Sequence, residues 1–371
     1  MPEIRALTGL RGLAALCVLW GHLYDHLGRL GLHADLGIVI ERLFLSAGRQ
    51  VDLFFVLSGF ILALSYGSWF GKGIALADCG RFLRRRLARV WPLHAVMLLA
   101  VVVMVFGSAA LGIAARNGLE RFDLATLPAH LLMVHAWGPF IDGVGEWNPP
   151  SWSVSVEFAA YLLFPLLMLG YAKLGRSPWP ALLLAAVLGL LLDATMHWEQ
   201  PGFPGVVRGV CEFALGAALA GLAGGRIATW LATTSGSLLA LVILGTVSAL
   251  VVDISFLIAL AAAPLLLSLC GRNGPSRFFG STPMHYLGEI SYSIYLGQFL
   301  FTSILFRIVK PEWMAASGLH AAIGVLAITA AVVLAASLSY RLVERPCRRL
   351  LAGKPVQLAS PSLAAARINQ A

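Results

Sequence analysis

The chain has 371 residues, of which 59% are hydrophobic and only 12% carry a charge. Soluble domains carry about 25% charged residues, so this chain lacks the polar surface that a water-exposed globule needs. Its net charge of +9 comes from basic clusters beside apolar runs, as on the cytoplasmic face of a membrane protein, and gives no reason to expect nucleic acid as a partner. The composition predicts an integral membrane protein embedded in a lipid bilayer.

Ten apolar runs are long enough to cross a hydrocarbon core of about 30 Å as helices. In chain order they cover residues 6–27, 50–67, 90–108, 153–172, 179–195, 205–223, 229–249, 251–270, 289–308 and 318–340. Two further segments are ambiguous. Residues 36–47 contain charges, and residues 127–137 are too short to cross and are expected to form a re-entrant or surface helix. The sequence predicts an all-α, polytopic membrane bundle of about ten transmembrane helices.

Basic clusters predict the orientation of the bundle, because Lys and Arg accumulate on the cytoplasmic side. Arg5 and Arg11 open the chain, RFLRRRLAR (81–89) follows the second run, and RLVERPCRRL (341–350) follows the tenth. With ten crossings these clusters share one face, so both termini are expected to be cytoplasmic. We expect residues 1–350 to form a single transmembrane domain and residues 351–371 a short, disordered cytoplasmic tail.

The first run contains RGLAALCVLWGH, in which Arg11 and His22 are eleven positions apart. Eleven residues make nearly three turns, so both side chains project from one helix face, separated by roughly 16 Å along the axis. Polar groups within the membrane are costly and usually functional. The pair therefore indicates a helix that lines a cavity. Alternatively, the Arg snorkels to the headgroups and the His bonds a neighbouring carbonyl.

The stretch NPPSWSVSVEF (148–158) places a carboxylate in the fourth run. The two prolines disfavour a preceding helix, and Ser151 is a plausible N-cap. Glu157 then lies roughly 9 Å below the outer interface, at a depth similar to that of His22. We expect the two to meet, so that the carboxylate orients the imidazole of a general base. The alternative is that Glu157 pairs with an Arg to hold helices together.

The segment RRRLARVWP (84–92) places Arg86 and Arg89 one turn apart at the cytoplasmic entrance of the third run. Guanidinium groups suit phosphate, so with Arg11 they could clamp a polyanionic donor, although each is also a positive-inside signal. Further candidate substrate-binding residues are Asp52, Trp152, Ser153, Tyr292 and Gln298. Trp152 could equally belong to an interfacial belt, and Tyr292 and Gln298 could form interhelical hydrogen bonds.

No metal site or disulfide framework is expected. His22 and His26 have a metal-ligand spacing, but no matching acidic or His-rich motif accompanies them. The five cysteines show no CxxC spacing.

Six motifs together resemble the membrane acyltransferase-3 family. They are R-x10-H from Arg11 to His22, VDLFFVLSGF (51–60), RxxR at Arg86 and Arg89, SWSVSVE ending at Glu157, GEISYSIYL (288–296) and VERP (343–346). They follow the family's order across residues 5 to 346.

The resemblance implies an enzyme of the bacterial inner membrane that O-acylates an extracytoplasmic carbohydrate or glycolipid. The donor would be cytosolic acyl-CoA, with acetyl-CoA expected, and no cofactor would be tightly bound. It also implies that His22 is catalytic and that Arg11, Arg86 and Arg89 lie near the donor. The chain departs from the family at Gln298, where members often have His.

A transporter or flippase for a polar or lipid-linked substrate is the competing function, because intramembrane charges also suit transport. The inverted repeat and the interrupted helix pairs typical of transporters are not apparent in the sequence. A structural or sensory subunit would leave the expected pairing of His22 with Glu157 unexplained. The acyl group, the acceptor and the oligomeric state are not predicted. The sequence also leaves open whether His22 acts as a general base in direct transfer or accepts the acyl group as a covalent intermediate.

Overall fold

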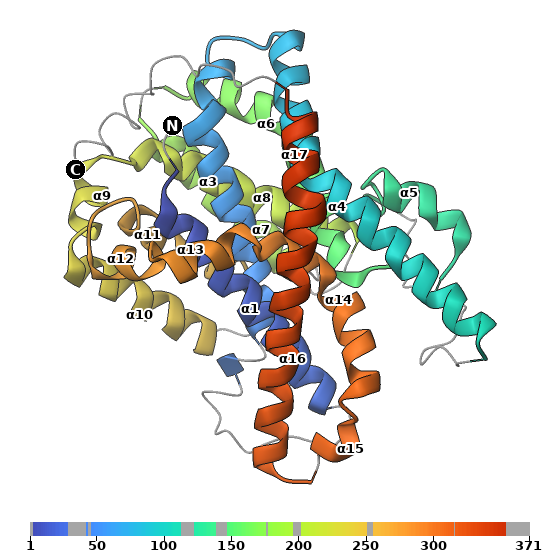
Figure 1. Ribbon diagram of the computed structural model, residues 1–371. Coiled ribbons are helices and arrows are strands. Elements are labelled where there is room, and N and C mark those ends of the chain that lie inside the picture. Colours follow the sequence, from blue (N-terminus) through green and yellow to red (C-terminus); the bar gives the residue numbers. More distant parts are fainter. Residues whose placement is uncertain are drawn as a thin grey trace.

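A computed structural model describes residues 3–28, 42–43, 46–112, 122–138, 147–175, 177–195, 202–250, 255–314 and 316–353. Every regular element in these ranges is a helix, and they contain no strand (Figure 1). The expected all-α architecture is therefore confirmed. The expected tail beyond residue 353 and most of residues 36–47 lie outside the described residues.

Six helical stretches have the length and apolar composition to cross a membrane. Three of them are single helices: α1 (Arg5–Gly28), α3 (Gln50–Phe70) and α4 (Leu76–Ala110). The stretch Pro149–Lys173 contains α6 (Trp152–Lys173), and Phe203–Leu222 contains α8 (Phe203–Leu219). The stretch Gly318–Leu351 contains both α16 (Gly318–Ser339) and α17 (Arg345–Leu351). Further helices in apolar runs are α7 (Trp179–Thr195), α10 (Thr234–Leu250), α11 (Ser255–Ser268) and α14 (Ser291–Ile308). The chain is a helical membrane protein. The number of crossings and the side of each terminus stay predictions.

Two helices differ from the apolar runs that predict them. Helix α4 begins at Leu76 rather than at residue 90, so the basic segment 81–89 belongs to the same helix. The run 229–249 is divided into α9 (Arg226–Leu231) and α10, because the chain turns tightly where Gly236 packs against the backbone of α9. The segment 127–137 contains only the short α5 (Leu127–Leu131), which agrees with its expected inability to cross.

Helices α3 and α8 cross so closely that their glycines leave no room for a side chain. A Cβ atom on Gly59 would lie 1.9 Å from the carbonyl oxygen of Phe213, and one on Gly216 would lie 1.9 Å from that of Val56. Small residues allow such backbone contact between membrane helices. The crossing fixes α3 in the interior of the bundle (Figure 1).

A second close crossing joins α1 to α13 (Thr282–Glu289). A Cβ atom on Gly288 would lie 1.9 Å from the carbonyl oxygen of Thr8, and one on Gly12 would lie 2.5 Å from the backbone nitrogen of Gly288. This approach brings the junction between α13 and α14 against the arginine of the first motif, Arg11.

Helices α16 and α17 form one long rod in Figure 1, joined by a π-helical segment, Tyr340–Glu344. Such wider turns are frequent at functional sites. Glu344, the acidic residue of VERP, lies at its end and is only 2% exposed.

Candidate functional site

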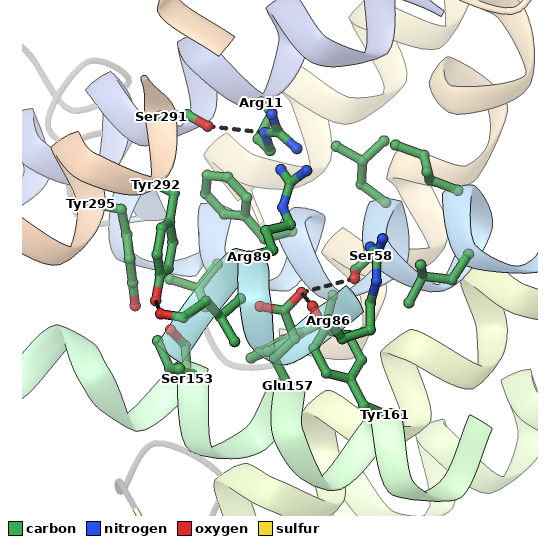
Figure 2. Close-up of a pocket in the computed structure, with 18 residues that line it drawn as sticks. Arg11, Ser58, Arg86, Arg89, Ser153, Glu157, Tyr161, Ser291, Tyr292 and Tyr295 are labelled. Atoms are coloured by element: carbon green, nitrogen blue, oxygen red, sulfur yellow. Dashed lines mark hydrogen bonds between the residues drawn. The ribbon is translucent and has the colours of Figure 1, made fainter. Parts of the chain in front are cut away.

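An inner cavity of about 110 Å³ lies between α1, α3, α4, α6 and α14 (Figure 2). Its apolar walls come largely from α3, which contributes Phe54, Phe55 and Ile61 among others. Its polar walls are Arg11, Ser58, Arg86, Arg89, Ser153, Glu157, Tyr161, Ser291, Tyr292 and Tyr295. The structure thus gathers into one cavity all three predicted donor-binding arginines and the predicted carboxylate.

Arg11 is held in this cavity by uncharged partners. Its Nε donates to the hydroxyl of Ser291 over 2.9 Å, and its Nη2 donates to the carbonyl oxygen of Gly288 over 2.8 Å. The Ser291 hydroxyl also donates to the Gly288 carbonyl over 2.8 Å. The α1–α13 crossing therefore fixes the guanidinium without neutralising its charge.

Arg86 and Arg89 project into the cavity from α4 (Figure 2). The Nη2 of Arg86 donates to the Tyr66 hydroxyl over 3.2 Å, and its Cζ lies 5.2 Å from the centre of the Tyr66 ring. Within the described ranges, none of the three arginines forms an ion pair. Like charges gathered in this way without paired carboxylates indicate a site for an anion.

Glu157 faces α3 and its own helix. Its Oε1 accepts hydrogen bonds from the Ser58 hydroxyl, over 3.0 Å, and from the hydroxyl of Tyr161, one turn along α6. The expected pair with His22 is not formed between these two described residues, because equal depth does not fix the direction in which a side chain projects. The i,i+4 spacing of Tyr161 from Glu157 was the sequence signal for this partner.

His22 lies outside the walls of the inner cavity, and its ring is exposed. Its Nδ1 is 3.2 Å from Oε1 of Gln298, which is 2% exposed. Tyr295, one turn before Gln298 on α14, does line the cavity. His22 thus sits beside the helix that closes this end of the cavity, and the predicted substrate residue Gln298 contacts the imidazole.

Apolar side chains of the inner cavity pack against α1 one turn before His22. Val51, Phe55 and Tyr295 line the cavity and belong to one buried cluster with Val18, which lies one turn before His22 on α1. We refer to these four residues as the apolar seal.

An outer cavity of about 290 Å³ shares Arg11, Ile61 and Arg89 with the inner one. Its remaining walls include Glu3, Thr8, Ser65, Glu289, Tyr340 and Arg348. The two cavities meet at the shared arginines, so they form a passage with guanidinium groups along its length.

Two of the other predicted substrate residues line the inner cavity. The Tyr292 hydroxyl donates to the carbonyl oxygen of Val90 over 2.7 Å, and that of Ser153 donates to the carbonyl oxygen of Pro150 over 3.1 Å. Both hydroxyls therefore also stabilise backbone. Ser151 occupies the expected N-cap position of α6, but its side chain does not cap the helix. Its hydroxyl instead lies 3.2 Å from Nε2 of the buried His135.

Asp52 and Trp152 do not line either cavity. Asp52 is fully buried, and its Oδ1 lies 3.4 Å from Nη2 of Arg208 on α8. The same guanidinium stacks over the Trp152 ring, with its Cζ 5.5 Å from the ring centre. This arrangement joins α3, α6 and α8 and gives Asp52 a structural contact, while the predicted contact with substrate stays a prediction.

Sequence reasoning did not assign Tyr161, Ser291, Glu344 and Arg348 to the site. Glu344 accepts a hydrogen bond from the buried Ser293 hydroxyl over 3.1 Å and interacts electrostatically with Arg89 and Arg11. The VERP motif marked the position of Glu344, but nothing in its sequence pattern indicates that a π-helical turn directs the carboxylate inward.

The fold and the site define a helical membrane protein with an arginine-lined passage. A family model of acyltransferase domains matches residues 4–341, and the chain belongs to this family, acyltransferase-3. It is also 30% identical to acyltransferase MdmB of Streptomyces mycarofaciens over 383 aligned residues, which cover 94% of this chain and 92% of that protein. A shorter match, 37% identical over 100 residues, relates 27% of the chain to 44% of protein 2 in the picA locus of Rhizobium radiobacter. No solved structure matches the chain.

The family decides between the two functions that the sequence left open. The protein is an acyltransferase, and the transporter alternative is set aside.

Proposed function

We propose that this acyltransferase moves an acyl group, acetyl in the simplest case, from cytosolic acyl-CoA to a hydroxyl of an extracytoplasmic carbohydrate or glycolipid. The membrane would be the bacterial inner membrane. The observation that carries the proposal is the set of guanidinium groups along the passage, Arg89, Arg11 and Arg86, which form no ion pair with any residue that the structure describes. The phosphates of CoA are the kind of polyanion that such groups bind.

In this proposal the uncharged arm of the donor extends into the inner cavity and carries the thioester towards the apolar seal. The acceptor hydroxyl approaches the exposed His22 from the other side. The seal must shift for the two to meet. His22 then takes the hydroxyl proton as the acceptor oxygen attacks the thioester carbonyl. The carbon–sulfur bond breaks, and the proton passes to the CoA thiolate, so that an ester and free CoA are formed.

Two residues support this step in different ways. Gln298 fixes the orientation of the imidazole through its 3.2 Å contact with Nδ1. Glu157 lies among the cavity arginines and, held by Ser58 and Tyr161, limits their repulsion before the donor binds. Its proposed role is therefore electrostatic, in place of the expected orientation of His22.

The test measures release of free CoA from acetyl-CoA, and labelled product from [14C]acetyl-CoA, in inverted membrane vesicles that retain native acceptors. Loss of a general base costs about 10²- to 10⁴-fold in rate. We expect that loss in His22→Ala while acetyl-CoA still binds. The matched control is His320→Ala, a partly exposed imidazole on α16 that lines neither cavity.

Glu157→Gln should instead alter donor binding. With one negative charge removed, the apparent KM for acetyl-CoA should change several-fold more than in a Ser153→Ala variant. Full activity of His22→Ala would refute the assignment of the base, and failure of the wild type to use any acyl-CoA would refute the proposed donor.

A further inference from the structure

The outer cavity holds a second arginine site that the donor-binding motifs do not include. Arg348 on α17 reaches this cavity together with Arg89 and Arg11. Arg348 and Arg89 interact electrostatically with each other as like charges. Among the residues the structure describes, Arg348 forms no ion pair with a carboxylate. Holding these cations together is unfavourable unless an anion lies between them.

The carboxylates of the outer cavity have other partners. Glu3 Oε1 accepts a hydrogen bond from the Thr8 hydroxyl over 2.7 Å and lies 3.1 Å from Nε2 of His285. Partial burial disfavours the charged form of Glu3, but these two contacts outweigh burial and keep its pKa below the ordinary value. Glu289 accepts a hydrogen bond from the Tyr340 hydroxyl over 3.2 Å. Neither acid therefore neutralises Arg348 directly. The buried Glu344 interacts electrostatically with Arg348, but it interacts with Arg89 and Arg11 as well. One carboxylate thus serves three cations, and an excess of positive charge remains.

The order of groups along the passage matches the order of charges in the proposed donor. From the inner end, the walls are Glu157 and Arg86, then the shared pair Arg11 and Arg89, then Arg348. In CoA an uncharged pantetheine arm follows the thioester, then a diphosphate, then a ribose with a 3′-phosphate. With the arm in the inner cavity, the diphosphate meets the shared pair, and the 3′-phosphate lies in the outer cavity. At about 290 Å³ this cavity is more than twice as large as the inner one.

We infer that the outer cavity binds the 3′-phosphorylated nucleotide of the donor and that Arg348 contacts the 3′-phosphate. This inference rests on the proposed function, because it assumes an acyl-CoA donor. It assigns to Arg348 a role in donor choice: the enzyme distinguishes acyl-CoA from thioesters that lack the terminal phosphate. The π-helical segment, which carries Tyr340 and leads into α17, brings this arginine to the cavity.

The test compares three donors with the full-length protein in nanodiscs: acetyl-CoA, acetyl-3′-dephospho-CoA and acetyl-pantetheine. Release of free thiol gives KM and kcat for each. In the wild type, loss of the 3′-phosphate should raise KM about tenfold, which equals ~1.4 kcal/mol. In Arg348→Ala the KM for acetyl-CoA should rise to that of the dephospho donor, while kcat and the KM for acetyl-pantetheine stay unchanged.

Arg349→Ala is the matched control, because Arg349 is the next residue, is also exposed and lines neither cavity. Arg348→Lys keeps the charge and should keep most of the preference, which separates binding of a phosphate from a general effect on folding. An unchanged KM ratio in Arg348→Ala, or a ratio that changes equally in Arg349→Ala, would overturn the inference and leave the proposed function standing. A wild type that uses acyl carrier protein but no acyl-CoA would overturn both.

Discussion

The crossing of α1 and α13 predicts that Gly288→Ala separates two helices that hold Arg11 in place. The new Cβ atom would lie 1.9 Å from the carbonyl oxygen of Thr8, whereas ordinary contact begins at 3.4 Å. One backbone must therefore move by well over an ångström. Overpacking of this kind costs about 1–3 kcal/mol, which exceeds the roughly 0.5–1 kcal/mol that Ala gains over Gly within a helix.

The assay is thermal unfolding in detergent, followed by tryptophan fluorescence at a fixed scan rate, because membrane proteins often unfold irreversibly. The net cost is up to about 2.5 kcal/mol, so at roughly 2–4 °C per kcal/mol the apparent Tm of Gly288→Ala should fall by up to about 10 °C. The KM for acetyl-CoA should rise as well, because the carbonyl partner of Arg11 is displaced. The control is Gly245→Ala in α10, where an added Cβ meets nothing within 4 Å, so Tm should stay the same or rise slightly. A Gly288→Ala variant as stable as the control would refute the close approach of α1 and α13.

Two further variants test other contacts of the site. Gln298→Ala removes the partner of His22, so kcat should fall about fivefold, the equivalent of one hydrogen bond of ~1 kcal/mol. The KM for the donor should be unchanged in steady-state assays. A weaker affinity for the donor with an unchanged kcat would contradict this role of Gln298. Arg208→Ala leaves Asp52 buried without its countercharge, which should destabilise the protein by about 3–5 kcal/mol and lower its apparent Tm. Arg226→Ala, at an exposed site on α9, serves as control, and equal Tm values for the two variants would show that the buried pair is not structural.

The helices were predictable because a membrane span needs a long apolar run, and each predicted run contains a helix. Their limits were less predictable. Hydropathy marks where a helix becomes apolar, whereas α4 already begins at Leu76 and carries its arginines along the same axis. The break between α9 and α10 depends on a local turn within an apolar run, which hydropathy does not register.

The shared location of the three arginines was predicted better than the partner of Glu157. Arg11, Arg86 and Arg89 share the inner cavity, because the i,i+3 spacing on α4 and the position of Arg11 on α1 fixed both depth and face. Counting residues along two separate helices gave similar depths for His22 and Glu157, but depth contains no information on rotation about each axis. The contacts of Glu157 with α3 depend on tertiary packing that its own segment does not encode.

The apolar seal has a consequence for the energy metabolism of a cell that carries this enzyme. A polar passage that remained open across the membrane would admit small ions, and each elementary charge that crosses dissipates about 2.3 kcal/mol per 100 mV of membrane potential. A short apolar constriction resists ion passage because an ion cannot keep its water there. If Val18, Val51, Phe55 and Tyr295 form such a constriction, the protein holds a charged cavity without acting as an electrical shunt, and smaller side chains at these positions would be costly to the cell even where acyl transfer continued.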